Sequence, residues 1–490
     1  MKVLFVYHNE IEESFMPYSI AVLGGVAKKC KVETKLFDTS FLKDINSKVI
    51  ENDRQVRERT GEYKKVEGYN PERKIVNLKE MFMQTVEEYK PDLIAATSTS
   101  YEFDSLIEMI YPAKIRFNIP LIVGGAHPTV APDQAINKKG VDMICIGEGE
   151  YAFESLLNKI KQNQDYQHIL NLWVKDSKGE IIRNNLGDLI DMDDIPEPDW
   201  DLIDSRHRIR PFEGELMNYG FFEISRGCPN TCSYCINHVK NKLYKESGVN
   251  SKIFRFHSPK EIVKRMVKYK LKYGFNHIHL IDDNLSVMPI EKLEELSKLY
   301  KDNVGIKFFT MGRPEPLVAN PQKVKVLAEM GCEMIALGAE SGNEELRRTV
   351  LKRPMDEDIL KKAVEIIKNQ GIKVSLFNII GFPTETKEMI FETIELNRRI
   401  KPDSYSVRFL HPYPGTAIRD FCIERQYITG DFEKEKRASF LMEPILNLPS
   451  PPHPTKQELI DLKQNFGRYV KMSDKEYEEI KAKELNKKYS

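Results

Sequence analysis

Short, largely apolar runs alternate with longer amphipathic runs over the first 165 residues of the chain. Residues 17–29 and 76–89 carry apolar positions at helical spacing. The runs that fit buried β-strands are residues 3–7, 32–37, 93–97, 121–123 and 143–146. Strand–helix alternation of this kind predicts an α/β domain with a doubly wound, Rossmann-like parallel sheet.

The loops that follow these strands are expected to form one ligand site. In a parallel sheet the carboxyl ends of the strands meet at one edge, where ligands bind. The loops are residues 8–10, 98–101, 124–129 and 147–150. Their glycines let a ligand approach the backbone closely. The fold alone leaves nucleotide, flavin and cobalamin open, although the G-x-G-x-x-G signature of dinucleotide sites is missing.

A second series of strand–helix units begins near residue 221. Its predicted strands are residues 221–225, 278–281, 306–310, 334–337, 374–380 and 405–409. Each strand except the last is followed by a helical segment, which predicts a partial (β/α)6 TIM-type barrel that is open on one side. Ser258 and Glu261, with Pro259 between them, predict a capping box at the start of the first barrel helix.

The breaks between these series suggest four regions. We predict a Rossmann-like domain at 1–165, a linker at 166–215, a barrel at 216–412 and a small, mostly helical C-terminal region at 413–490. Residues 38–73 are polar and charged and are interpreted as an insertion or a long excursion to which the sequence assigns no structure. The linker is rich in Asp, Pro and Arg, and its segment PEPDWDLID is typical of a stretch that packs across a surface.

Composition excludes several classes of protein. The 74 basic and 74 acidic side chains give no net charge, so a nucleic-acid partner is not suggested. No run approaches the roughly 18 apolar residues of a membrane span, and the first ten residues become polar too soon for a signal peptide. We therefore expect a cytoplasmic protein. Its odd number of cysteines, seven, argues against a disulfide framework.

Three of the cysteines fall within eight residues, in the run Cys228-Pro-Asn-Thr-Cys232-Ser-Tyr-Cys235. Iron–sulfur clusters of the [4Fe–4S] type usually have four thiolate ligands, so three would leave one iron open to another ligand. The alternative is a zinc site in which His238 is the fourth ligand. Cys145 and Cys332 lie in apolar stretches and are expected to be core thiols, whereas Cys30 and Cys422 carry no signal.

This C-x3-C-x2-C motif, with Tyr234 before its third cysteine, resembles the radical S-adenosylmethionine (SAM) superfamily. Arg226, Gly227 and Pro229 strengthen the match. The resemblance implies that the open iron binds the amino and carboxylate groups of SAM. An electron from the cluster then cleaves SAM to a 5′-deoxyadenosyl radical. A partial barrel is also that superfamily's fold.

The same resemblance implies where the rest of SAM binds. It assigns Asp282 to the methionine amino group and Glu340 to the methionine or ribose. Tyr234 is expected near adenine, and the residues expected at the nucleoside are Asn378, Ile380 and Gly381. The chain departs from the family where Gly-Gly-Glu is usual after the second strand, because IDDN stands there.

The order of further segments resembles the cobalamin-binding radical SAM family. GGAHPTVAP, VDMICIGEGE and EPDWDLID precede the cysteines, and GAESGNEELRR, NIIGFPTET and HPYPGTAI follow them. The D-x-H-x-x-G cobalt-ligand motif is absent, which is usual in this family. The resemblance implies cobalamin on the strand-end loops, with contacts from His8, Ser98, Thr99, Gly124, Gly125, His127, Pro128, Gly147, Glu148, Gly149 and Glu150. His8 and His127 are the candidates to approach cobalt, although a histidine on a loop also serves as a hydrogen-bonding residue.

The resemblance implies methyl transfer from methylcobalamin to an unactivated carbon or to phosphorus. Radical cyclisation or rearrangement without methyl transfer is a second hypothesis, and a non-catalytic protein with a structural zinc site is a third. The expected partners are a small-molecule or lipid substrate and a low-potential electron donor such as flavodoxin or ferredoxin. The cofactors implied are a [4Fe–4S] cluster, SAM and cobalamin.

Overall fold

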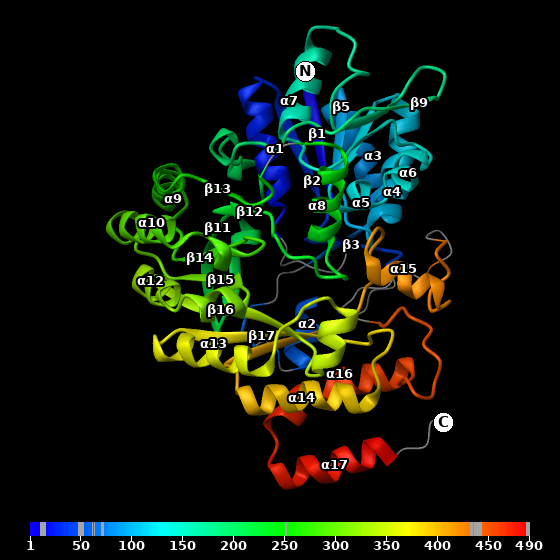
Figure 1. The fold of residues 1–490 in the computed structure, drawn as a ribbon. Coiled ribbons are helices and arrows are strands. Elements are labelled where there is room, and N and C mark those ends of the chain that lie inside the picture. The colour runs from blue at the N-terminus through cyan, green and yellow to red at the C-terminus, as the bar shows by residue number, and fades with distance from the viewer. Residues whose placement is uncertain are drawn as a thin grey trace.

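The computed structural model describes residues 1–9, 16–47, 53–60, 62, 64–69, 73–249, 252–431, 435 and 443–486. Two sheets lie one above the other, with the first half of the chain above and the second half below (Figure 1). Glu10, in the predicted loop after the first strand, and parts of the 38–73 insertion lie outside the described residues.

The upper sheet confirms the predicted doubly wound domain. Its strand order is β2-β1-β5-β6-β7-β8-β9, and the first five strands are parallel. These five strands are β2 (Glu33–Asp38), β1 (Lys2–Tyr7), β5 (Leu93–Thr97), β6 (Leu121–Gly124) and β7 (Met143–Cys145). All five lie within one or two residues of their predicted positions, because their apolar runs are short and bounded by turn residues.

Helices cover both faces of this sheet, as its alternating side chains require. Val3 and Phe5 of β1 face the core that includes α1 (Tyr18–Lys29) and α7 (Glu150–Lys161). The next residues along the strand, Leu4 and Val6, point to the opposite core. That second core includes α3 (Leu78–Tyr89) and α4 (Phe103–Phe117).

The predicted linker contributes more structure than its sequence suggested. Strands β8 (Leu172–Lys175) and β9 (Ile181–Arg183) extend the upper sheet with antiparallel pairing, beyond the predicted boundary at residue 165. In β8 only Leu172 and Val174 are buried, and the strand is four residues long and is followed at once by charged residues, so its short apolar run was not recognised as a strand. The sheet is therefore mixed rather than wholly parallel.

The rest of the linker packs against both halves of the chain, as its composition predicted. Trp200 is buried against Tyr18 of α1 and Tyr269 of α9 (Pro259–Tyr273). The Asp199 N–H donates to Ala21 O at 2.7 Å, and the Lys28 ammonium lies 2.5 Å from the Asp199 carboxylate. A Cβ at Gly25 would lie 2.2 Å from the carbonyl oxygen of Glu197, so only glycine lets α1 approach the linker this closely.

The lower sheet is the predicted partial barrel with one strand more. The six predicted strands appear as β11 (Glu215–Phe222), β14 (His277–Leu280), β15 (Phe308–Gly312), β16 (Cys332–Glu340), β17 (Lys373–Ile380) and β18 (Ser404–Phe409), all parallel. The first of them, predicted at 221–225, begins six residues earlier and ends three residues earlier than predicted. An antiparallel strand, β10 (Ile209–Phe212), is added beside β11. The sheet therefore has two edge strands, β10 and β18, on either side of its opening.

The barrel helices begin with α9 and continue with α10 (Ile290–Asn303), α11 (Pro314–Ala319), α12 (Gln322–Met330), α13 (Glu357–Asn369) and α14 (Lys387–Ile400). The predicted capping box of α9 does not form, because the Ser258 side chain makes no cap hydrogen bond. Instead the backbone N–H of Ser258 donates to Asp193 of the linker, and Glu261 pairs with Lys264 and Arg265. A hydrogen bond to the linker therefore takes the place of the predicted cap within the helix.

The C-terminal region is mostly helical, as predicted, with α15 (Ala417–Glu424), α16 (Lys456–Lys471) and α17 (Asp474–Asn486). The helices α16 and α17 lie against α14 at the lower end of the molecule (Figure 1). Other elements of the upper half and its insertion are the short strands β3 (Leu42–Asp44) and β4 (Lys74–Val76) and the helices α2 (Asp53–Arg59), α5 (Ala126–Val130) and α6 (Pro132–Asn137). In the described part of the chain, no helix is both long and apolar enough to cross a bilayer.

Candidate functional site

The three motif cysteines lie on one loop between the barrel sheet and α8 (Ile236–Glu246). The loop follows β12 (Ser225–Arg226), which pairs with β13 (Arg255–Phe256). Gly227 has a left-handed φ of +93°, and a Cβ there would lie 2.2 Å from the carbonyl oxygen of Ile253. Glycine is therefore required where the chain turns into the loop.

Nitrogen donors point at two of the three sulfurs. The Asn230 amide donates to Cys228 Sγ at 3.2 Å, and Arg313 Nη1 lies 3.3 Å from Cys232 Sγ. Burial raises the pKa of the Cys235 thiol to about 11, so a thiolate there needs a metal cation to stabilise it. Hydrogen bonds to cluster sulfurs set reduction potential, so Asn230 and Arg313 suit an iron–sulfur site.

Three thiolates on one loop suit an iron–sulfur cluster, because each thiolate of a cubane binds a different iron. A mononuclear zinc site, the alternative, needs four ligands within about 2.0–2.3 Å of one point.

A large cavity of about 1260 Å³ occupies the barrel and its open side. Three of the predicted SAM residues line it, Tyr234, Glu340 and Asn378. Glu340 ends β16 with a left-handed φ of +64°, an uncommon conformation for a non-glycine residue. Burial raises the pKa of its carboxyl group, and Arg353 and the Tyr234 hydroxyl partly oppose that shift. Tyr234 and Glu340 therefore sit together beside the cysteine loop.

Asn378 and the predicted SAM residues outside the cavity, Asp282, Ile380 and Gly381, make contacts within the protein. Asp282 is fully buried, and its Oδ1 accepts a hydrogen bond from the Ser225 hydroxyl at 2.6 Å. Asp282 is therefore hydrogen-bonded to β12, the strand before the cysteine loop. The Asn378 amide is 3.3 Å from Asn397 Oδ1 in α14, and the side chain of Ile380 is buried in the core. The backbone N–H of Gly381 donates to Glu385. The SAM roles of these residues stay predictions.

A second cavity, of about 350 Å³, lies at the carboxyl ends of the upper strands. Its walls come from both halves of the chain, since β12 and α8 of the second half face the strand-end loops. Six predicted cobalamin contacts line it: Gly124, Gly125, Gly147, Glu148, Gly149 and Glu150. The sequence prediction of a ligand site at this sheet edge therefore coincides with a cavity.

The other five predicted cobalamin contacts do not line this cavity. His8 Nε2 lies 3.0 Å from the Ser105 hydroxyl, and His127 Nδ1 lies 3.1 Å from the Ser100 hydroxyl. Both imidazoles are almost completely buried. The remaining three are Ser98, Thr99 and Pro128. The two histidines serve here as hydrogen-bonding core residues, which was the alternative interpretation, and cobalt ligation by either stays a prediction.

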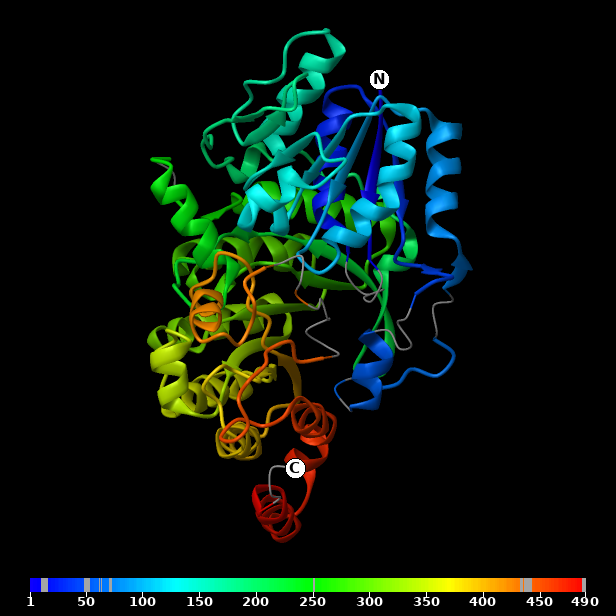
Figure 2. The ribbon, with the colours of Figure 1, turned by 90° about the vertical axis from the view of Figure 1, so that its right-hand side faces the viewer.

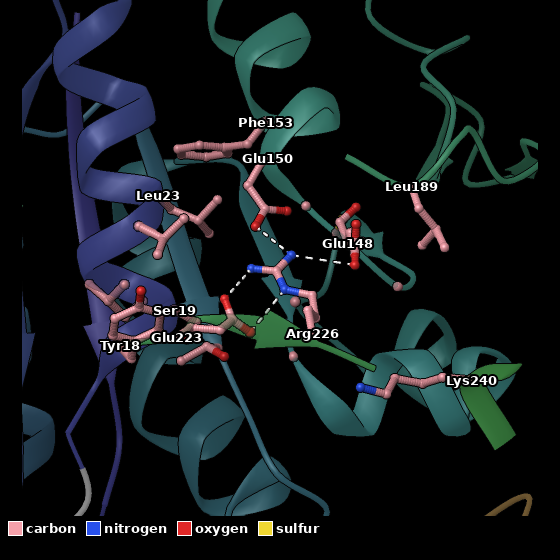
Figure 3. Close-up of a pocket in the computed structure, with 18 of the residues that line it drawn as sticks. Tyr18, Ser19, Leu23, Glu148, Glu150, Phe153, Leu189, Glu223, Arg226 and Lys240 are labelled. Atoms are coloured by element: carbon pink, nitrogen blue, oxygen red, sulfur yellow. Dashed lines mark hydrogen bonds and ion pairs between the residues drawn. The ribbon is translucent and has the colours of Figure 1, made fainter. Parts of the chain in front are cut away.

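A cluster of ion pairs joins the two halves across the smaller cavity (Figure 3). Arg226, two residues before Cys228, contacts Glu150 at 2.9 Å and makes a two-pronged pair with Glu223 at 2.9 and 3.0 Å. Its Nη1 is also 3.4 Å from Glu148, which pairs in addition with Arg255. Each of the three carboxylates therefore has a guanidinium partner.

These pairs hold Glu148 charged despite its burial. Burial by itself raises the pKa of Glu148, but Arg226 and Arg255 more than offset it, so the pKa lies below its ordinary value. The backbone N–H of Glu148 also donates to the Tyr244 hydroxyl of α8 at 2.8 Å. The position of the cysteine loop relative to the upper sheet is thus fixed by several bonds.

Sequence reasoning missed Glu223, Tyr244, Arg255 and Arg313. Arg255 contacts Glu148 across 107 positions of sequence, and no local pattern marks it. Tyr18 and Ile281 were also missed, although they line both cavities. The two cavities therefore adjoin.

Comparison with known proteins agrees with this arrangement. Residues 222–396 match the model of the radical SAM superfamily, and residues 65–157 match that of the B12 binding domain. These matches imply a [4Fe–4S] cluster, SAM and cobalamin as cofactors.

Similar proteins include methyltransferases and a cyclase. An uncharacterized methyltransferase of Pyrococcus horikoshii is 24% identical over 69% of this chain and 71% of its own length. An anaerobic magnesium-protoporphyrin IX monomethyl ester cyclase of Rubrivivax gelatinosus is 22% identical, over 91% of this chain and 74% of its own.

A solved structure has the same fold over nearly the whole chain. It is the cobalamin-dependent SAM radical enzyme OxsB with aqua-cobalamin and SAM bound. Its TM-score is 0.68 at 14% identity, and the likeness covers 98% of this chain and 70% of that one. At this identity the likeness concerns the fold alone.

Proposed function

We propose that this chain, which belongs to the radical SAM proteins with a B12-binding domain, is a cobalamin-dependent methyltransferase that acts on an unactivated carbon. The observation that carries the proposal is the junction of the two cavities at Tyr18 and Ile281. One cavity lies at the strand-end loops of the B12-binding domain, and the other contains Tyr234 and Glu340 beside the cysteines. A substrate in the barrel would therefore face both the strand-end loops of the B12-binding domain and the cysteine loop.

The residues present suit the implied cofactors. Cys228, Cys232 and Cys235 would hold the cluster, and the glycines and glutamates of the strand-end loops would surround the corrinoid. The cluster would supply the electron that cleaves SAM, and the corrinoid the methyl group. Tyr234 and Glu340 would orient SAM, and the aromatic walls of the barrel would exclude water from the reacting groups.

Radical cyclisation without methyl transfer is the second candidate. It is favoured by the relative from Rubrivivax gelatinosus, a cyclase whose similarity extends over 91% of this chain. The two reactions would use the same cavities and differ in whether a methyl group enters the product. The substrate would be a small molecule or a lipid, the electron donor a flavodoxin or ferredoxin, and the location the cytoplasm.

Anaerobic reconstitution with iron, sulfide, cobalamin, reductant and methyl-labelled SAM tests the proposal. We expect 5′-deoxyadenosine and S-adenosylhomocysteine by mass spectrometry, with label in the product. Deoxyadenosine with unlabelled product would favour cyclisation. Zinc in place of iron and sulfide in protein purified without oxygen would overturn both.

A further inference from the structure

A short segment of the N-terminal half lies far below its own sheet, beside the barrel. The segment comprises residues 53–60, 62 and 64–69, and is called the closing segment. It begins with α2, which Figure 2 shows in blue next to the barrel strands and the red helix α16. Val56 and Thr60 are buried, so the segment is packed in place.

The closing segment contacts one edge of the barrel sheet through Glu62. Its Oε2 lies 2.9 Å from Arg408 Nη1 of β18, and its Oε1 accepts the backbone N–H of Val407 at 3.4 Å. An edge strand leaves such N–H groups without a neighbouring strand, and the Glu62 carboxylate takes that strand's place. The Glu62 side chain is only 2% exposed.

The same segment contacts the other edge through Lys64 and Tyr69. The Tyr69 hydroxyl donates to the carbonyl oxygen of Ile209 in β10 at 2.7 Å. The Lys64 ammonium lies 3.2 Å from Glu213, in the turn between β10 and β11. The closing segment therefore spans the open side of the barrel from β18 to β10.

This placement makes the segment part of the cavity wall. Arg57, Glu62, Lys64 and Tyr69 line the 1260 Å³ cavity. Opposite and around them stand aromatic rings, among them Phe212, Phe221, Phe309, Phe377, Tyr405 and Tyr413. A single ligand pocket usually measures about 300–1,000 Å³, so the cavity has room for SAM and a second ligand.

We propose that the closing segment is the missing wall of the partial barrel, that Glu62 is the positioning residue that fixes it, and that this wall limits the size of the substrate. The rings in the lining suit a large molecule that itself contains rings, because aromatic side chains stack on such surfaces. The inference rests on the proposed function only in naming the occupant a substrate.

Hydrogen exchange of the holoenzyme, followed by mass spectrometry, tests the contact. In Glu62→Gln the neutral amide weakens the bonds to Arg408 and Val407. We expect exchange in peptides covering 404–409 and the closing segment to be about tenfold faster, the factor that corresponds to one net hydrogen bond. Glu67→Gln is the matched control, since Glu67 is an exposed glutamate of the same segment. Equal exchange in the two variants would overturn the role of Glu62.

If Glu62→Gln speeds up hydrogen exchange throughout the protein, Tyr69→Phe is the second test. This substitution removes only the hydroxyl that donates to the carbonyl oxygen of Ile209. Faster exchange confined to residues 64–69 and β10 supports the closing role, and unchanged exchange overturns it.

Two dyes of different size test the limit on the occupant. They are 1-anilinonaphthalene-8-sulfonate and its covalent dimer. In Glu62→Ala the larger dye is expected to bind the holoenzyme several-fold more tightly, while binding of the smaller dye changes little. Equal changes for both dyes, or no change against Glu67→Gln, would count against a size-limiting wall. None of these measurements needs turnover, so a failure of the proposed methyl transfer would be seen separately, as absent deoxyadenosine in the wild type.

Discussion

The two cavities are built from different chemistry although they adjoin. The smaller cavity, between the B12-binding sheet and the cysteine loop, is crossed by Arg226, Arg255 and their three glutamates. The larger one, in the barrel, is lined by many aromatic rings together with charged side chains such as Arg57, Glu62 and Arg408. Ion pairs have fixed partners and directions, so they set the distance between two domains. Aromatic walls accept many orientations, so they suit the part of the protein that selects a substrate.

Buried carboxylates show the same contrast. Glu148 at the junction is paired with arginines and stays charged. Glu385, after β17 in the barrel, is fully buried and accepts the N–H groups of Gly381 and Phe382, and burial raises its pKa to about 8. Burial is common to both, so the neighbouring cations decide the charge.

Removing one cluster ligand should have the largest effect and should distinguish the functions of the two cavities most clearly. In Cys232→Ala the cluster would lose one of its three thiolates, so we expect no deoxyadenosine from SAM under reducing conditions. Cobalamin binding, measured by absorbance titration, should persist, because its cavity lies on the other side of the junction. Cys30→Ala, at the end of α1, is the control. Loss of cobalamin binding in Cys232→Ala would mean that the cavities are not independent.

Removing Arg226, the cation that three glutamates share, should weaken the contact between the two halves of the chain. Arg226→Gln leaves Glu148, Glu150 and Glu223 with Arg255 as their remaining guanidinium. Removing one partner of a buried pair costs about 3–5 kcal/mol of unfolding free energy, which denaturant titration measures. Arg116→Gln, which breaks an exposed pair with Glu87, should cost about 0–1 kcal/mol. Similar losses in the two variants would contradict a special role for Arg226.

Glu385→Gln should change how stability depends on pH. The pKa of Glu385 is raised from 4.5 to about 8, so the folded state favours the protonated carboxyl. The associated stability is present below pH 4.5 and is lost as pH rises through 8. Between pH 5.5 and 7.5 the wild type should therefore lose about 2–3 kcal/mol relative to the variant, by denaturant titration. Parallel curves would show that burial does not shift this group.

An exposed pair should give the smallest effect. The hydrogen bond from Arg399 lowers the pKa of Glu357 to about 2. The stability it contributes is present above pH 4.5 and is lost as pH falls toward 2. Because solvent screens this pair, Glu357→Gln should cost only about 0.2–1 kcal/mol at pH 7 and nothing at pH 2. A loss as large as that of Arg226→Gln would remove the distinction between the buried cluster and the surface.

The sequence determined the elements and the chemistry that lies close together along the chain. Apolar runs of three to seven residues located the parallel strands of both sheets, because the side-chain pattern of a buried strand is local. The spacing of Cys228, Cys232 and Cys235 identified one loop, and Gly147-Glu148-Gly149-Glu150 marked one edge of the upper sheet. In contrast, β8, β9 and β10 were missed, because strands of three or four residues that bury few side chains or none leave little pattern.

Only the tertiary structure decided which distant residues meet. Arg226 reaches Glu150 across 76 positions, and Glu62 reaches Arg408 across 346. Such pairs depend on how two folded units dock, and a sequence pattern with the period of a strand or helix carries no information about docking. For the same reason the sequence assigned no structure to the polar segment at 38–73, whereas the fold places its closing segment across the open side of the barrel.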